Sequence, residues 1–129
     1  MASALYPSFK ELLLGGGIDL ADDDIRAILI DTGEYTYSTA HETLDDIPAE
    51  AQIAVSGALT NKTIAGGVFD ADDVTLTSVS GNSVEAIVLY KHTGTASTSP
   101  LIAYINGVSA TPNGADITAQ WDATGIFAL

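Results

Sequence analysis

Two runs of mainly apolar positions in the second half of the chain predict two neighbouring strands. β-Branched, aliphatic and aromatic residues fill the runs 84–91 (VEAIVLYK) and 101–106 (LIAYIN), and small polar residues bound both. The nine residues that link them, 92–100, are fewer than the dozen or so that a parallel crossover needs. We therefore expect an antiparallel hairpin at the centre of a sheet. Both faces of its first strand are apolar, which predicts that the sheet is covered on both sides.

Shorter runs of the same kind predict a single, mainly β domain over residues 18–129. Gly, Asn, Asp, Ser and Pro, the residues of turns, bound these runs. Besides the hairpin, the expected strands are 25–30, 58–64, 66–70, 74–79 and 117–121, with 51–55 as a further edge strand. The apolar run 125–129 should form either a last strand or an interface. Roughly seven or eight short antiparallel strands at close spacing are typical of a sandwich or barrel with jelly-roll-like topology, which is the fold class that we expect.

Residues 1–17 are expected to form an N-terminal arm with a short helix. Ser8 and Glu11 have the spacing of a capping box, and the glycines at 15–17 end the helical pattern. The stripe on one face of this helix consists of Phe9, Leu12 and Leu13. A helix of about two turns is not stable alone in water. We therefore expect it to dock, either on its own sheet or on a neighbouring subunit.

Composition adds a strong charge signal. The 129 residues include 17 Asp and Glu but only 4 Lys and Arg, a net charge of −13, while 47% of the residues are hydrophobic. That hydrophobic share predicts a folded domain and not an acidic disordered tail. Phosphate neutralisation needs a basic cluster that this chain lacks, so we expect neither a nucleic-acid nor a membrane partner. No apolar run approaches the roughly 18 residues of a membrane span, and no signal peptide is visible.

Two acidic clusters are the first candidates for chemistry. They could bind Ca²⁺ or Mg²⁺ loosely, but in a loop that starts at Asp70 the sixth position is Thr75 and the twelfth is Gly81, so the EF-hand pattern fails. Solvated strand ends or helix caps are the favoured interpretation of these carboxylates. The clusters are Asp22, Asp23 and Asp24, and Asp70, Asp72 and Asp73.

Other reactive residue types lack a supporting pattern. Without Cys the chain forms no disulfide and no thiolate metal site, and His41 with Glu42 and Asp45 falls short of a zinc ligand set. No Gly-x-Ser-x-Gly elbow is present, and the glycines at 15–17 follow a helix, so they form no phosphate cradle. Trp121 and the tyrosines could form a sugar-stacking face, but core or interface packing is favoured. We expect no catalytic residue, metal or cofactor.

Several stretches, taken in order, carry a resemblance that covers most of the chain. They are 6–13 (YPSFKELL), 18–20 (IDL), 25–30 (IRAILI), 58–63 (ALTNKT), 69–74 (FDADDV), 87–104 (IVLYKHTGTASTSPLIAY) and 117–126 (ITAQWDATGI). Together they resemble a family of small β-rich virion proteins of tailed bacteriophages, similar to the capsid decoration, or cement, class. The run at 90–104 is its most specific part. At position 92 this chain has His where the family resemblance leads us to expect Asp. Residues 30–58 match the family only loosely.

The resemblance implies a structural protein without catalytic residues. It would bind the major capsid protein on the outer surface of the virion and stabilise the shell, as a homotrimer made in the host cytoplasm. The acidic exterior favours an outer location, because it repels packaged DNA. The expected capsid or subunit contacts are Tyr6, Phe9, Leu12, Leu13, Trp121 and Phe127. A tail or neck component and a host-surface or carbohydrate-binding module are the alternatives.

Overall fold

Antiparallel strands are the main regular secondary structure of the protein, whose computed structural model describes residues 4–128. The expected arm begins at Met1 and the expected last strand ends at Leu129, so their residues 1–3 and 129 lie outside the described part. The strands are β1 (Ala4–Leu5), β2 (Ile25–Ile30), β3 (Gln52–Val55), β4 (Thr63–Ala65), β5 (Val68–Asp70), β6 (Val74–Leu76), β7 (Val84–Lys91), β8 (Leu101–Ala110), β9 (Ile117–Ala119) and β10 (Phe127–Ala128). The helical segments are α1 (Pro7–Leu14) and the short 3₁₀ turns η1 (Leu44–Asp46), η2 (Ala49–Ala51) and η3 (Ala96–Thr98). The protein is therefore mainly β with one α-helix, as the sequence predicts.

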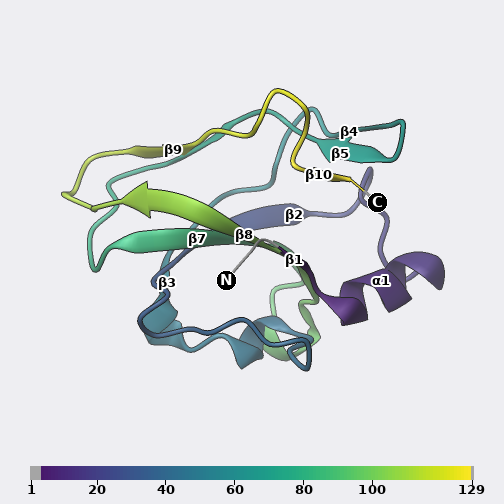
Figure 1. Cartoon of the computed structure of the whole chain (residues 1–129), viewed down its shortest axis with the longest axis horizontal. Helices are drawn as coiled ribbons and strands as arrows, with labels where there is room; N and C mark the ends of the chain where they lie inside the picture. Colours follow the sequence, from purple (N-terminus) through teal and green to yellow (C-terminus); the bar gives the residue numbers. More distant parts are fainter. Residues whose placement is uncertain (1–3, 129) are drawn as a thin grey trace.

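The strands form three antiparallel sheets in layers. The largest has the order β1-β8-β7-β2-β3, a second has the order β10-β5-β4, and β6 pairs with β9. In Figure 1 the five-stranded sheet lies in the middle, with β4, β5, β9 and β10 above it and α1 and the 3₁₀ turns below. None of the sheets closes on itself within residues 4–128, so the barrel alternative is not seen there.

The hairpin of β7 and β8 is the centre of the five-stranded sheet, which confirms the prediction. Val88 is paired with Tyr104 of β8 on one side and with Ile28 of β2 on the other. Both faces of β7 are covered, since Val88 and its neighbour Leu89, which points to the opposite face, are both fully buried. β8 runs to Ala110, beyond the expected end at residue 106.

The upper layer is made of short strands with one solvent-exposed face. β4 and β5 flank a glycine turn, as expected, and β5 also pairs with β10 through Phe69 and Phe127. The apolar C-terminal run thus forms a last strand, which was one of the two expected outcomes. Leu76 of β6 and Ala119 of β9 are buried beneath the layer. Thr75, which precedes Leu76 in β6, is exposed. This layer supplies the cover that the apolar upper face of β7 requires.

Helix α1 docks on the same protomer, below the sheet and against β8. Phe9 is fully buried, whereas Leu14 at the end of the helix is 89% exposed. The predicted capping box is wrong, because Pro7 occupies the first helical turn, Tyr6 is the N-cap, and no side chain caps the helix. The Ser8 hydroxyl donates to the His41 carbonyl instead. Among residues 4–128, no helix is long and apolar enough to cross a membrane.

Candidate contact surfaces

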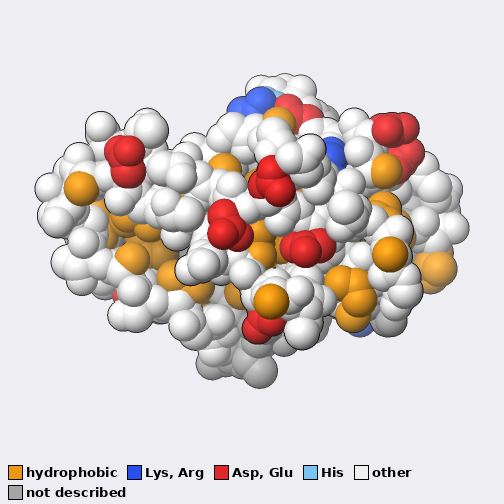
Figure 2. Space-filling model, turned by 90° about the horizontal axis from the view of Figure 1, so that it is seen from above, with side chains coloured by type: hydrophobic (Ala, Val, Ile, Leu, Met, Phe, Trp, Pro, Cys, Tyr) orange, Lys and Arg blue, Asp and Glu red, His pale blue; other side chains and the backbone are white. Residues whose placement is uncertain are grey.

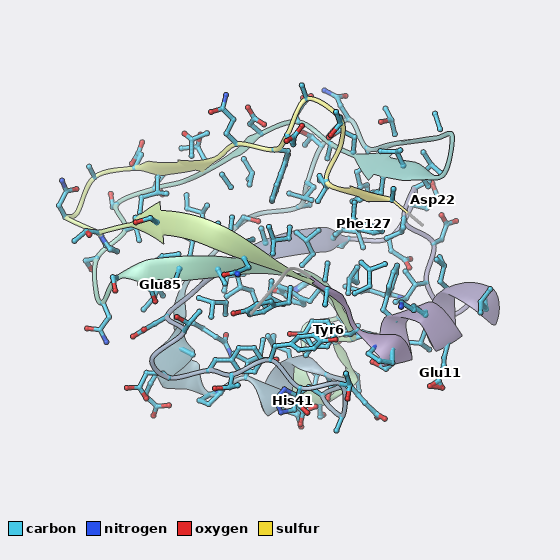
Figure 3. All side chains as sticks on the ribbon, in the orientation of Figure 1. Tyr6, Glu11, Asp22, His41, Glu85 and Phe127 are labelled. Carbon is cyan, nitrogen blue, oxygen red and sulfur yellow. The ribbon has the colours of Figure 1, made fainter. Side chains whose placement is uncertain are left out.

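Tyr6 is held in a buried aromatic cluster below the sheet (Figure 3). Its hydroxyl lies 2.7 Å from that of Tyr35, which in turn lies 2.9 Å from Nδ1 of His41. The Tyr6 ring also packs on Tyr37, with 4.9 Å between ring centroids. Burial raises the pKa of Tyr6 well above its usual range and raises the pKa of Tyr35 to about 12. Tyr6 therefore joins the start of α1 to residues 35–41 as a core residue.

Phe9 and Phe127 meet although they come from opposite ends of the chain. Their rings are in edge contact at 5.8 Å, and Phe127 also packs on Phe69 at 5.3 Å. Phe127 is half-buried, and both Leu12 and Leu13 are partly buried against the core. The two predicted contact elements, the N-terminal helix and the C-terminal strand, are thus adjacent in space.

Trp121 lies apart from these residues, just after β9 in the upper layer. Its backbone N–H donates to Oδ1 of Asp73 at 2.9 Å, and its indole N–H donates to the Asp72 carbonyl at 3.0 Å. The ring is partly buried against the core. Because the polar atom of the indole is bonded within the chain, Trp121 presents only part of its ring to a partner.

The loop between β7 and β8, residues 92–100, is built by hydroxyl groups. Thr93 Oγ1 lies 2.6 Å from Thr98 Oγ1 and 3.0 Å from Ser99 Oγ, and Ser99 Oγ donates to the Thr95 carbonyl at 2.9 Å. Ser99 is buried, whereas residues 93–98 are exposed. These bonds link the two sides of the loop and leave an uncharged tip exposed, a site that the predicted contact residues did not include.

Two apolar grooves lie along β8. The first, of about 250 Å³, is lined by Ala4, Leu5, Ala103, Tyr104, Ile105, Ile126, Phe127 and Ala128. The second, of about 310 Å³, is lined by Leu29, Ile87, Gly107, Val108, Ser109, Ala110, Ile117, Thr118, Ala119 and Gln120. We call them the β8 grooves. No lining residue is charged. The signal in the sequence was the absence of Asp, Glu, Lys and Arg from 92 to 115, which sequence reasoning missed.

The few cations of the chain are concentrated at one corner. Arg26 Nη2 lies 2.9 Å from Oδ2 of Asp24, Lys91 Nζ lies 3.2 Å from Oδ2 of Asp23, and Lys62 donates to the Asp23 carbonyl. The hydrogen bond from Arg26 is the main cause that lowers the pKa of Asp24. Figure 2 shows carboxylates scattered over the upper face, with few Lys or Arg side chains among them. On this face carboxylates therefore outnumber the Lys and Arg side chains.

The predicted acidic clusters serve local bonding. Besides the two carboxylates at the cationic corner, Oδ1 of Asp70 accepts the Ala71 N–H and Oδ2 of Asp72 accepts from the Asn61 amide. In the part of the chain that is described, no three His, Asp or Glu side chains are grouped so as to hold a metal ion. Tyr35 contacts Nδ1 of His41, the histidine considered for zinc. These contacts agree with the strand-end and capping interpretation.

No family model and no curated protein matches this chain. The surfaces described above consist of a hydrogen-bonded, uncharged loop, two apolar grooves and an acidic exterior. These features suit contacts with other macromolecules.

Proposed function

We propose that this chain is a structural virion protein of a tailed bacteriophage, a decoration or cement protein that binds the outer capsid surface. It contacts the major capsid protein, stabilises the shell as a homotrimer and has no catalytic role. The observation that carries the proposal is the resemblance of residues 90–104 to that class. This stretch forms the end of β7, the hydroxyl-bonded loop and the start of β8, so it is both central to the fold and presented at its surface.

The distribution of charge supports an outer location. Three of the 4 cations are engaged with Asp23 or Asp24 at one corner, which leaves an acidic exterior on a chain of net charge −13. Such a surface repels packaged DNA and keeps a solvent-facing shell soluble. Modest contacts with each capsid subunit are strengthened when three linked copies bind together.

The proposal includes a finer description of the fold. The β layers stacked on either side of a buried interior are compatible with a jelly-roll-like sandwich, in which the five-stranded sheet is one half and the short upper strands belong to the other.

Quantitative mass spectrometry of purified virions tests the function. We expect the copy number to match that of the major capsid protein, and we expect the isolated protein to pellet with undecorated capsids. A copy number far below that of the capsid protein, with binding to tails or necks, would favour the tail or neck alternative. Absence of the protein from purified virions would reject both the cement proposal and the tail or neck alternative.

The carbohydrate-binding alternative has its own test at Trp121. A glycan-binding module should bind glycans on an array as isolated protein and lose that binding on Trp121→Ala while its circular dichroism is unchanged. We expect no glycan binding, because the Trp121 ring is partly buried against the core and its indole N–H already donates to the Asp72 carbonyl.

A further inference from the structure

We propose that the β8 grooves form the surface on which a second copy of this chain packs. The inference rests on the proposed function only for the expectation of an oligomer. Its content, the location of the contact between copies, comes from the distribution of charge and from the edge of the five-stranded sheet.

The first argument is electrostatic. Each copy carries a net charge of −13, so two copies can approach closely only where neither presents carboxylates. The β8 grooves meet this condition, because none of the residues that line them is charged. A basic partner surface, in contrast, would be drawn to the carboxylates elsewhere on the exterior and would gain nothing from an uncharged groove.

The second argument is the edge of β8. Natural edge strands are protected from pairing by charged residues, proline, bulges or covering segments. β8 has a register irregularity in its pairing with β7, but its ten residues include no charge and no proline. Among residues 4–128, β1 pairs with β8 at Ala103 and Tyr104, and no strand covers the outer edge at 108–110.

The third argument is continuity. One groove takes residues 103–105 of β8 and the other takes residues 107–110, so the two follow each other along one strand. Half-buried apolar side chains line both, among them Ile105, Val108 and Ile126. Figure 2 shows apolar side chains within the hollowed part of the upper face. A second copy would remove this apolar surface from water without burying an acid.

The test uses the isolated protein and two single substitutions at exposed positions of the grooves, Ser109→Glu and Ala128→Glu. Ala58→Glu is the matched control, because Ala58 is exposed, lies outside both grooves and receives the same added charge. Sedimentation equilibrium and light scattering give the mass over a range of concentrations, and circular dichroism checks the fold.

We expect the unsubstituted protein and Ala58→Glu to reach a mass of at least twice 13.3 kDa, and three times that mass if the proposed homotrimer forms. Each groove substitution should raise the dissociation constant about tenfold or more, because it places like charges in the contact.

An unsubstituted protein that stays monomeric at every soluble concentration overturns the inference. So do groove variants that associate as strongly as Ala58→Glu. Groove variants that keep their mass but no longer pellet with capsids would assign the grooves to the capsid protein instead. Presence in virions is measured separately, so failure of the inference and failure of the proposed function are distinguishable.

Discussion

Gly125 is the residue on which the return of the C-terminal strand depends. Its φ is +113°, and a methyl group on its Cα would lie 2.2 Å from Cγ1 of Val68, a short and stiff side chain. The next residue, Ile126, donates its N–H to the Phe69 carbonyl. Steric demand and backbone conformation therefore both require glycine here.

Gly125→Ala should destabilise the protein by several kcal/mol and detach β10 from β5. Gly114→Ala is the control, since Gly114 also has a positive φ, +87°, but open space around it. That control should cost only about 1–2 kcal/mol, the penalty of a left-handed alanine. Urea unfolding measures both, and equal losses would contradict a steric role for Gly125.

The buried tyrosines predict a loss of stability at alkaline pH. Because burial raises the pKa of Tyr35 to about 12, the folded state keeps a proton that the unfolded state releases near pH 10. The stabilisation is complete below about pH 10 and is lost as the pH rises toward 12. The expected slope is about −1.4 kcal/mol per pH unit for each such tyrosine.

Urea unfolding at a series of alkaline pH values measures this slope, and Tyr35→Phe should reduce it. The same substitution removes hydrogen bonds to Tyr6 and His41, so the slope and not the absolute stability is the readout. An unchanged slope would exclude Tyr35 as its source.

At the residue scale, the sequence predicted the burial of an apolar side chain better than the contacts that individual side chains make. Phe9 was expected on the docking stripe of the helix, and it is fully buried. Ser8 was assigned to a cap on spacing alone, but spacing does not show that Pro7 fixes the first turn and that the Ser8 hydroxyl lies near His41. Tyr6 was expected to contact a partner, and nothing local indicated that Tyr35 and Tyr37 would enclose it. Such contacts span about 30 residues and follow from the fold.

At the scale of elements, α1 is held by one deeply buried side chain. Phe9→Ala should cost about 3–5 kcal/mol, because it removes a fully buried ring that packs on Phe127. Leu14→Ala on the same helix removes a side chain that is 89% exposed and should change the stability by less than about 0.5 kcal/mol. Denaturant unfolding of both variants gives the comparison, and similar losses would show that the helix is not docked through Phe9.

The elements that could be predicted are those with enough residues to show a period. β7 has eight residues and β2 has six, and both were expected at the observed boundaries. β1 has two residues, too few for any pattern, and its partner Tyr104 is far away in the sequence. A last strand was one expected outcome for 125–129, but its pairing with Phe69 follows from the fold and not from a local pattern. The β8 grooves escaped prediction for the same reason, since their walls come from β1, β9 and β10 as well as β8.

At the scale of the whole molecule, the net charge of −13 predicts an unusual response to salt. Copies that meet through uncharged grooves still repel each other through the rest of their surfaces. The Debye length falls from about 10 Å at 0.1 M salt to about 3 Å at 1 M, so salt screens this repulsion. Self-association should therefore strengthen as NaCl is raised, which sedimentation velocity can follow. Association that weakens with salt would indicate ion pairs between copies and contradict the uncharged contact.

The two ends of the described chain border one groove, where Ala4 and Leu5 face Ile126 and Ala128. An affinity tag or displayed cargo joined directly at residue 4 or residue 128 would emerge beside the proposed contact between copies. Purification handles could thus alter assembly in a way that resembles a mutational defect. A permissive insertion point is better sought at the Gly66–Gly67 turn, which joins exposed residues of the upper layer. Because residues 4 and 128 line the same groove, a short linker between them would allow a circular permutant with new termini at that turn.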